Sequence, residues 1–450
     1  MNTSPSRTFL LVAIVVIILL GLHFLPQLTV AGEQLRKVNI LCDVVPEPST
    51  HDDVAAAKVA PPPLPQAEKS ECPPGVTCIQ DYSEGKAGGM DNFYRALSET
   101  GRRLVRIAYF GDSFIEGDML TDKLRDMLQD KYGGSGVGWV DCASETAGFR
   151  RSIRANSSGF TEHAVIAPEG FVSRFQGINE RYYTLSGSAS STMKGVKYMK
   201  HTASWHRSEL FFRTDGDVHL SASINGGKPQ VYDVSPSSGL QSVVVSGSIG
   251  RIEWQVKSAG AGSYFYGVCN EAEKGIVVDN LSMRGSAGFT LGGIPQSTLE
   301  AFAAKRPYDL IILHFGLNVL SDKSNLVFFK SYKHRMEKVV ESFRKAYPKA
   351  SILVVSVSDR AQRYNGNIQT LSSVVTLSQY QQLIASDTHT AYFNLLQAMG
   401  GKGSIKKMAE SRPSLANKDY THLNFRGGVF VAKKFYDALI AGKDYYERHK

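Results

Sequence analysis

The chain has 450 residues, of which 42% are hydrophobic and 21% are charged. These proportions are typical of a globular protein and exclude an intrinsically disordered chain. The formal net charge is +9, but the Lys and Arg residues are scattered and form no block. We therefore expect no nucleic-acid partner and only a mild preference for anionic surfaces, such as phospholipid or acidic wall polymers.

Residues 1–30 are predicted to form an N-terminal membrane anchor or signal. Residues 9–22 are apolar apart from Gly21, and continuing to Leu25 gives about the minimum length of a membrane-spanning helix. A cleaved signal peptide is the alternative, with Ala31 as a weak cleavage site. The apolar run is long for a signal peptide, which favours an uncleaved anchor. Both alternatives predict export; the favoured one predicts a periplasmic or extracytoplasmic protein held at the inner membrane.

Residues 31–80 are predicted to form a linker. Eight prolines lie between Pro46 and Pro74, and such a composition favours a stiff, extended segment. Cys72 and Cys78 are close enough in sequence for a small disulfide loop, which an oxidising compartment permits. The chain has five cysteines, so at least one thiol is expected to be free or intermolecular; five unpaired thiols are the alternative.

Residues 81–164 and 276–450 carry the pattern of an α/β fold. Residues 104–110 form a predicted strand, and an amphipathic helix follows with Leu120, Leu124 and Leu128 on one stripe. Buried strands are expected again at 308–316 and 350–359, with a striped helix between them, and the last helix begins near Arg426. This alternation predicts a doubly wound parallel sheet.

Residues 165–275 have a different pattern. Short segments of alternating polarity are separated by Gly, Ser and Asn turns, which predicts an antiparallel β-sandwich. The sandwich interrupts the α/β sequence, as an insertion at a surface loop does. Its aromatic residues are expected to pack in the sandwich core, with stacking on sugar rings as the alternative. They are Tyr182, Tyr183, Trp205, Trp254 and Tyr266.

A Gly-Asp-Ser sequence at 111–113 stands at the end of the first strand. Ser113 in that place is ordinarily a helix cap or a turn residue. A nucleophilic serine needs a base, an orienting acid and donors for an oxyanion. Asp419 and His422, three residues apart before the last helix, offer the acid and the base.

Two further residues offer oxyanion donors. Asn318 follows a predicted strand, so its side-chain amide emerges at the same sheet edge as Ser113. Gly285 lacks a Cβ, so its N–H can approach a ligand closely. Plain turn and conformational roles are the alternatives for these two residues.

The motifs occur along the chain as Gly-Asp-Ser, then Gly285, then Asn318, and finally the Asp419–His422 pair. In this chain order they resemble the motifs of the SGNH/GDSL hydrolase superfamily. The resemblance implies that Ser113 is the nucleophile, that Asp419 and His422 complete a triad, and that the Ser113 N–H, the Gly285 N–H and the Asn318 side chain form an oxyanion hole. The positive end of the following helix is expected to assist the Ser113 N–H. The α/β-hydrolase elbow does not fit, because Ile115 stands where that motif has its second glycine.

Three longer stretches, 117–140, 265–286 and 394–408, are similar to bacterial peptidoglycan O-acetylesterases, in which a β-sandwich resembling a carbohydrate-binding module interrupts the SGNH core. The resemblance covers about residues 90–440. Phe114 and Val319 depart from it: His or Leu is usual after the serine, and an acidic residue is common after the asparagine.

The resemblance implies an exported serine esterase that removes O-acetyl groups from a cell-envelope polysaccharide, with peptidoglycan favoured, through an acetyl-enzyme and without a metal or organic cofactor. Transfer of the acetyl group to a sugar hydroxyl and a non-catalytic wall-binding scaffold are the alternatives. His314 is expected to be a core residue, with a role as a second base as the alternative. Asp359 and Arg360 are expected in a solvated loop, with substrate contact as the alternative. The glycan, the disulfide pairing and the oligomeric state stay open.

Overall fold

The computed structural model describes residues 9–10, 13–14, 29–30, 33–34, 63–64, 66–68, 70–86, 88–144, 146–321, 324–364 and 366–449. Residues 1–60 and 61–450 form separate units. In the first, β1 (Thr29–Val30) pairs with β2 (Glu33–Gln34). Most of the predicted anchor over 1–30 and most of the linker over 31–80 lie outside the described residues. Among the described helices, none has the length and apolar character needed to cross a membrane.

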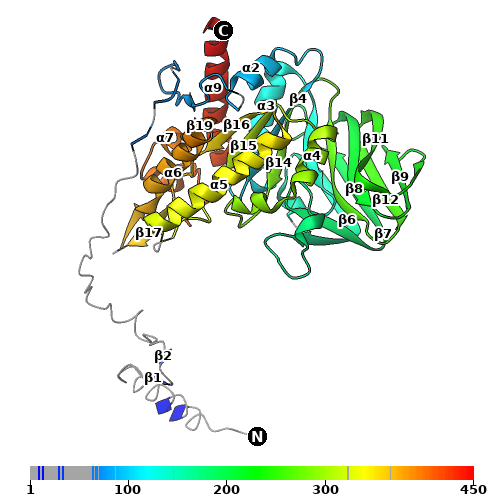
Figure 1. Ribbon diagram of the computed structural model, residues 1–450, viewed down its shortest axis with the longest axis horizontal. Helices are drawn as coiled ribbons and strands as arrows, with labels where there is room; N and C mark the ends of the chain where they lie inside the picture. Colours follow the sequence, from blue (N-terminus) through cyan, green and yellow to red (C-terminus); the bar gives the residue numbers. More distant parts are fainter. Residues whose placement is uncertain are drawn as a thin grey trace. The chain divides into compact units, whose positions relative to one another are not determined.

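A six-stranded sheet forms the centre of the α/β part (Figure 1). Its order is β14 (Gly275–Ser282), β4 (Leu104–Gly111), β15 (Leu310–His314), β16 (Ser351–Val355), β19 (Ala391–Phe393) and β3 (Ile79–Asp81). The first five strands are parallel, and β3 is antiparallel to β19. The α/β prediction is therefore confirmed, with one antiparallel strand added at the edge.

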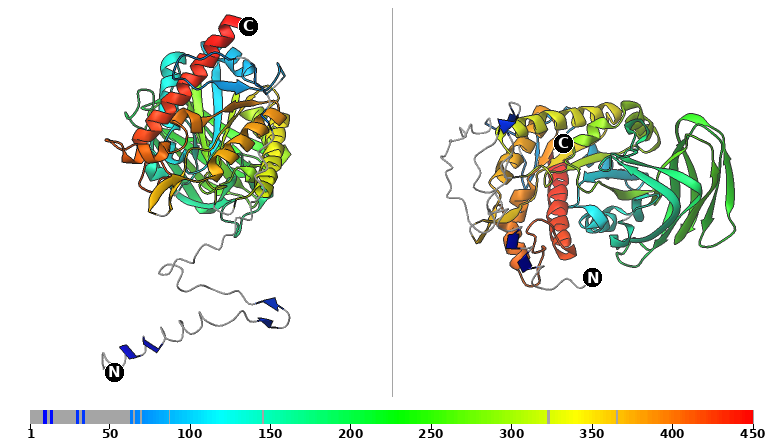
Figure 2. Two further views of the ribbon diagram at one scale, coloured as in Figure 1. Left: turned by 90° about the vertical axis from the view of Figure 1, so that its left-hand side faces the viewer. Right: turned by 90° about the horizontal axis from the view of Figure 1, so that it is seen from below.

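Helices cover both faces of this sheet. The long helices α5 (Leu326–Ala346) and α9 (Phe425–His449) lie on opposite faces (Figure 2). The predicted stripe on α5 is buried, from Phe329 to Phe343. The other helices are α2 (Asp91–Leu97), α3 (Thr121–Tyr132), α4 (Gln296–Lys305), α6 (Ser373–Asp387), α7 (Leu395–Met399) and α8 (Ser404–Glu410). Short 3₁₀ turns are η1 (Glu116–Asp118), η2 (Ala147–Phe149), η3 (Ser173–Phe175) and η4 (Phe289–Gly293), and β17 (Ala361–Tyr364) pairs with β18 (Asn367–Thr370).

The predicted antiparallel region is also present, as one curled sheet with its own apolar core. Its strands are β5 (Gly136–Asp141), β6 (Ile153–Ala164), β7 (Arg181–Gly195), β8 (Trp205–Thr214), β9 (Val218–Ile224), β10 (Gln230–Val234), β11 (Ser237–Ile249), β12 (Arg251–Ala259) and β13 (Tyr264–Glu271). One half runs β6-β7-β12-β9-β10 and the other β5-β13-β8-β11, and the pair Phe265–Tyr183 joins them. Strands β5 and β6 lie before residue 165, so the antiparallel sheet begins earlier in the chain than the predicted boundary.

Buried ion pairs connect the two sheets. Glu271 at the end of β13 accepts from Arg106 of β4 at 2.7 Å and from Arg306 at 2.8 Å. Arg306 also contacts Asp279 of β14 at 2.7 Å. Burial alone would raise the pKa of Glu271, but Arg306 and Arg106 outweigh it and lower that pKa to about 2. Glu271 therefore stays ionised and fixes the antiparallel sheet on the parallel one.

The cysteines partly settle the pairing left open by the sequence. Cys72 and Cys78 form a disulfide. Cys142 and Cys269 are buried free thiols, and burial raises the pKa of both. Cys42 lies outside the described residues. A buried thiol with a raised pKa is a poor nucleophile, so neither free cysteine competes with Ser113 for a catalytic role.

Candidate active site

Three of the predicted site residues follow the carboxyl ends of adjacent strands. Strands β4, β14 and β15 end in register, with Gly111 opposite both Ser282 and His314. Ser113 stands two residues beyond β4, Gly285 three beyond β14 and Asn318 four beyond β15. The sheet therefore delivers all three to one edge, where open α/β sheets bind their ligands.

Asp419 and His422 reach the same edge from the loop between α8 and α9. The bridge between Ala416 and Leu423 closes this loop. The His422 Nε2 lies 3.1 Å from the Ser113 Oγ, and its Nδ1 lies 2.8 Å from the Asp419 Oδ2. The three side chains thus form a continuous hydrogen-bonded chain, in which Nε2 can accept the hydroxyl proton and the carboxylate can stabilise the resulting imidazolium.

The Asp419 carboxylate is oriented by its own loop. Its Oδ1 accepts from the backbone N–H groups of Thr421 and His422, both at 3.0 Å. Partial burial would raise the pKa of Asp419, but the hydrogen bonds from His422 and Thr421 lower it. Asp419 is therefore held ionised, as the acid of a triad must be.

The backbone donors face open space. Within the described part of the chain, the N–H groups of Ser113 and Gly285 have no acceptor. Gly285 has a φ of +80°, in the left-handed region that favours glycine, and a Cβ there would meet nothing within 4 Å. The two N–H groups are thus uncommitted, as the donors of an oxyanion hole must be before substrate binds.

Asn318 differs, because its side-chain amide already has acceptors. Its Nδ2 donates to the Asp112 Oδ2 at 3.2 Å and to the Ser286 carbonyl at 3.0 Å. An oxyanion would have to share or replace the bond to Ser286. The bond to Asp112 holds the amide at the site.

Asp112 was not among the predicted site residues. Its side chain is 1% exposed and accepts from the Phe114 N–H at 2.9 Å as well as from Asn318. Burial raises the pKa of Asp112 to about 6. The Gly-Asp-Ser sequence contained the signal, but only the fold shows that the aspartate positions Asn318.

Residues 359–360 do not lie in a solvated loop, so that expectation was wrong. Asp359 is fully buried and accepts from the Thr370 hydroxyl and the Ile405 N–H. Arg360 donates to the carbonyls of Leu317 and Leu320 at 2.8 and 3.1 Å. Arg360 therefore braces the loop that carries Asn318.

His314 is a core residue, as predicted. It is 3% exposed, its Nδ1 lies 3.0 Å from the Tyr109 hydroxyl, and burial lowers its pKa to about 3. The proposed alternative role as a second base is not served by this position.

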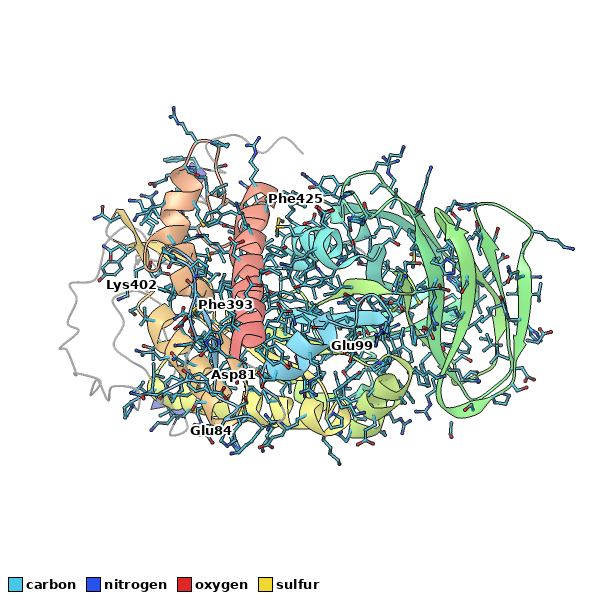
Figure 3. The ribbon with its side chains drawn as sticks, turned by 90° about the horizontal axis from the view of Figure 1, so that it is seen from above. Asp81, Glu84, Glu99, Phe393, Lys402 and Phe425 are labelled. Atoms are coloured by element: carbon cyan, nitrogen blue, oxygen red, sulfur yellow. A yellow bond between two sulfur atoms is a disulfide. The ribbon has the colours of Figure 1, made fainter. Side chains whose placement is uncertain are left out.

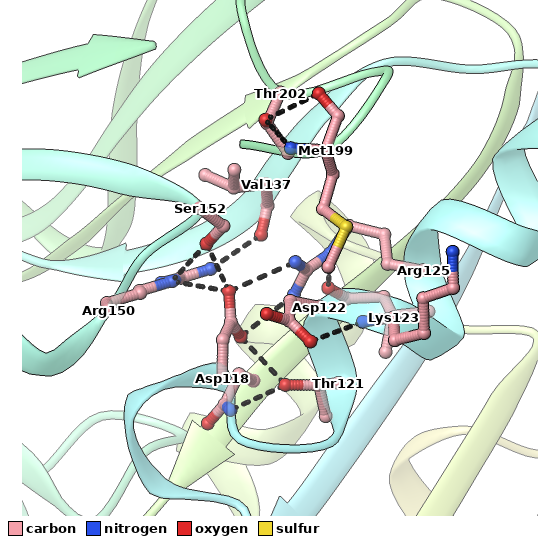
Figure 4. Close-up of polar contacts among 12 residues, drawn as sticks. Asp118, Thr121, Asp122, Lys123, Arg125, Val137, Arg150, Ser152, Met199 and Thr202 are labelled. Atoms are coloured by element: carbon pink, nitrogen blue, oxygen red, sulfur yellow. Dashed lines mark hydrogen bonds and ion pairs between the residues drawn. The ribbon is translucent and has the colours of Figure 1, made fainter. Parts of the chain in front are cut away.

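The helix expected directly after Ser113 begins only at Thr121, so its positive end does not lie at the Ser113 N–H. The intervening turn η1 needs positive φ at Gly117 (+64°) and Asp118 (+63°). Asp118 is buried and accepts from Arg125 at 3.1 Å, Arg150 at 2.8 Å and the hydroxyls of Thr121 and Ser152 (Figure 4). The two arginines overcome burial and lower the pKa of Asp118. This network fixes the turn beside the nucleophile.

A cavity of about 250 Å³ opens over the Ser113–His422 pair, and we call it the catalytic cavity. Arg284 reaches across it to Glu116, with the Arg284 Nε 2.7 Å from the carboxylate. Phe425, at the start of α9 (Figure 3), carries the Arg151 guanidinium 3.4 Å above its ring. The lining consists of Ser113, Phe114, Glu116, Gly117, Met119, Phe149, Arg284, Asn417, His422, Leu423 and Phe425.

One group among the described residues has the geometry of metal ligands: Asp126, Asp130 and His201. Lys123 and Lys200 already pair with the two carboxylates at 2.7 Å each. None of these residues lines the catalytic cavity.

The aromatic residues proposed for sugar stacking are core residues. The exposed fractions of Tyr182, Tyr183, Trp205, Trp254 and Tyr266 are 3% or less. Their rings pack inside the curled sheet or between it and the α/β part. The expected core packing of these five residues is therefore confirmed, and the alternative of sugar stacking is not.

Comparison with solved structures gives a likeness of the whole described fold. A peptidoglycan O-acetylesterase structure matches with a TM-score of 0.67 and 20% identity, over 80% of this chain and 98% of that chain. The chain shares the fold of that esterase. This agrees with the resemblance to SGNH/GDSL hydrolases in the motifs.

Two further similarities are weaker than this one. A Bacillus subtilis protein matches with a TM-score of 0.31 and 11% identity, over 65% of this chain and 90% of its own. An acetyl xylan esterase matches with a TM-score of 0.27 and 14% identity, over 36% and 81%. No protein-family model and no curated protein sequence matches the chain.

Proposed function

We propose that the protein is a serine esterase that removes O-acetyl groups from a cell-envelope polysaccharide, with peptidoglycan as its substrate. The observation that carries the proposal is the hydrogen-bonded chain from the Ser113 Oγ through His422 to Asp419, at 3.1 and 2.8 Å. Free backbone donors lie at the same strand ends. A serine, a base, an oriented acid and oxyanion donors are what acyl transfer requires.

The reaction begins with acylation. His422 Nε2 takes the Ser113 proton as the Oγ attacks the acetyl carbonyl carbon, and the carbonyl oxygen becomes an oxyanion. The N–H groups of Ser113 and Gly285 and the Asn318 amide stabilise this charge. His422 then gives its proton to the sugar oxygen, the ester C–O bond breaks, and the acetyl group stays on Ser113.

Deacylation repeats these steps with water. His422 takes a proton from water, whose oxygen attacks the acetyl carbonyl, and the Ser113 oxygen leaves with the proton returned by His422. Acetate is the product. The His422 side chain is 42% exposed, so water reaches the base readily, which favours hydrolysis over transfer of the acetyl group to another sugar.

The substrate is proposed on two supports. The chain shares the fold of a peptidoglycan O-acetylesterase over most of its length, and its net charge of +9 suits an anionic wall polymer. The apolar N-terminal sequence supports export and anchoring at the membrane, with the proline-rich segment as a spacer.

The test is acetate release from O-acetylated peptidoglycan and from acetylated xylan, with the Ser113→Ala variant as the control. We expect faster release from peptidoglycan and none above background from the variant. Faster acetate release from acetylated xylan would refute peptidoglycan as the substrate. Appearance of the acetyl group on an added sugar in place of free acetate would identify a transferase, and binding without turnover would identify a scaffold.

A further inference from the structure

A second cavity, of about 320 Å³, lies where the curled sheet meets the parallel one, and we call it the junction cavity. It is walled by the segment 139–157, by Ser191 of β7 and by Asn280 and Ser282 of β14. Its volume falls in the range of small-molecule sites, roughly 300–1,000 Å³. Neither the triad nor the oxyanion donors line it.

The junction cavity adjoins the catalytic cavity. Gly117 lines both of them. Their walls also meet along η2, because Gly148 lines the junction cavity and Phe149 lines the catalytic one. A polymeric ligand with one unit in one cavity can therefore place its next unit in the other.

The charged groups in the wall of the junction cavity already have partners. Asp118 is paired with Arg150, at 2.8 Å. Asp141 is paired with Arg181, at 2.9 Å. These pairs leave little reason for a charged ligand to bind there.

The remaining polar groups are neutral. Hydroxyl and amide side chains come from the segment after β5 and from the paired strands β6 and β7, where Ser157 lies opposite Ser191. They are Ser144, Thr146, Asn156, Ser157 and Ser191, and β14 adds Asn280 and Ser282. Such a wall matches a ligand rich in hydroxyl and amide groups, as an N-acetylated sugar is.

Phe149 stands at the boundary between the cavities. Its side chain is 63% exposed, and its Cβ lies so close to Gly117 that a Cβ at Gly117 would approach it to 3.2 Å. The Phe149 ring lines the catalytic cavity together with Ser113. Its apolar face can cover a sugar ring.

We propose that the junction cavity is a glycan subsite that holds an uncharged sugar next to the one whose ester enters the catalytic cavity, with Phe149 contacting the sugar chain between them. The inference rests on the proposed function. It gives the curled sheet a direct part in substrate binding through β6 and β7, in place of the buried aromatics.

The test compares two tryptophan substitutions on one strand. Ser157 lines the junction cavity, and the next residue, Ser158, does not; both are exposed on β6. Ser157→Trp should fill the cavity, and Ser158→Trp is the matched control. Acetate release from O-acetylated peptidoglycan should fall about tenfold in Ser157→Trp only, because remote binding energy is lost. Both variants should hydrolyse a small chromogenic acetate at the wild-type rate.

A binding measurement separates the subsite from the catalytic proposal. An unacetylated oligomer of N-acetylglucosamine should bind the wild-type protein in calorimetry, and Ser157→Trp should weaken this binding while Ser158→Trp does not. Phe149→Ala, at an exposed position, should also reduce action on polymer and weaken binding of the oligomer. Unchanged oligomer binding in Ser157→Trp, or equal losses in both tryptophan variants, would overturn the subsite. Failure of the wild type to cleave any acetate would overturn the esterase while leaving the binding result to judge the subsite.

Discussion

The sheet edge that carries Ser113 and the junction between the two sheets both depend on carboxylates. The carboxylates of the two regions differ in exposure and in the partners they have. Asp419 is 47% exposed and sits in a loop, whereas Glu271 and Asp279 are fully buried between two sheets. The partner of Asp419 is a histidine, which must gain and lose a proton. The partners of the buried pair are arginines, which keep their charge.

This difference follows from the work of each region. Asp419 orients an imidazole that gains and loses a proton in each reaction cycle, and this pair lies where water reaches it. A group that fixes two sheets is best ionised throughout, which burial permits only when the charges are fully paired. Loss of a group at the edge should therefore remove activity, and loss of one at the junction should remove stability.

Ser113→Ala should show the largest effect. Removing the nucleophile should lower kcat on a small chromogenic acetate by about 10⁵–10⁶-fold, the scale for a serine of a triad, with thermal unfolding unchanged because Ser113 is only partly buried. Retention of more than a few per cent of activity would refute the nucleophile.

His422→Ala should lose nearly as much activity as Ser113→Ala, and Asp419→Asn should lose less, about 10⁴-fold. The acid orients the imidazole through a 2.8 Å bond but takes no proton from the serine. Small, equal losses in steady-state kinetics would mean that the pair has only a structural role.

Asn318→Ala should lower kcat by about 10²–10³-fold, the scale for one oxyanion donor. KM should change little, since the amide acts mainly on the charge that develops in the transition state. A defect confined to KM would instead assign Asn318 to ground-state binding of the substrate.

Glu271→Gln should sharpen the comparison, because it should spare kcat and lower the free energy of unfolding by about 3–5 kcal/mol through uncompensated buried charge. Glu99→Gln is the control: Glu99 (Figure 3) pairs with Arg103 at the surface, and its loss should cost about 0.5 kcal/mol. Similar urea midpoints for the two variants would contradict the role given to the junction.

The same residue predicts a dependence on pH. The pKa of Glu271 falls from 4.5 to about 2 on folding, so between those values the unfolded chain binds more protons than the folded one. The stabilisation is complete above pH 4.5 and is lost as pH falls toward about 2. The difference in unfolding free energy between the wild type and Glu271→Gln should therefore shrink over that range; a constant difference would refute the assignment.

The strands and the residues at their ends could be predicted, because local sequence determines both. Residues 104–110 alternate little between apolar and polar side chains, and Gly111 follows them directly. The parallel register of the strands then brings Ser113, Gly285 and Asn318 to one edge of the sheet. The three-residue spacing of Asp419 and His422 is by itself more often structural. Their assignment as acid and base came from the resemblance of the whole motif set to SGNH/GDSL hydrolases.

Contacts between distant segments could not be predicted in the same way. Asp112 binds Asn318 across 206 positions, and Phe149 meets Gly117 only because η2 folds back onto η1. The burial of one aromatic residue could, however, have been predicted from the sequence. Ile252, Trp254 and Val256 alternate with polar residues on β12, which places Trp254 on the inner face.

The most direct measurement is mass spectrometry of the protein after reaction with a small serine-directed phosphonate, followed by digestion. The account predicts one modification, on the peptide that contains Ser113, with none in Ser113→Ala and much slower labelling in His422→Ala, because His422 takes the hydroxyl proton at 3.1 Å. Labelling at another serine, or unchanged labelling in His422→Ala, would contradict it.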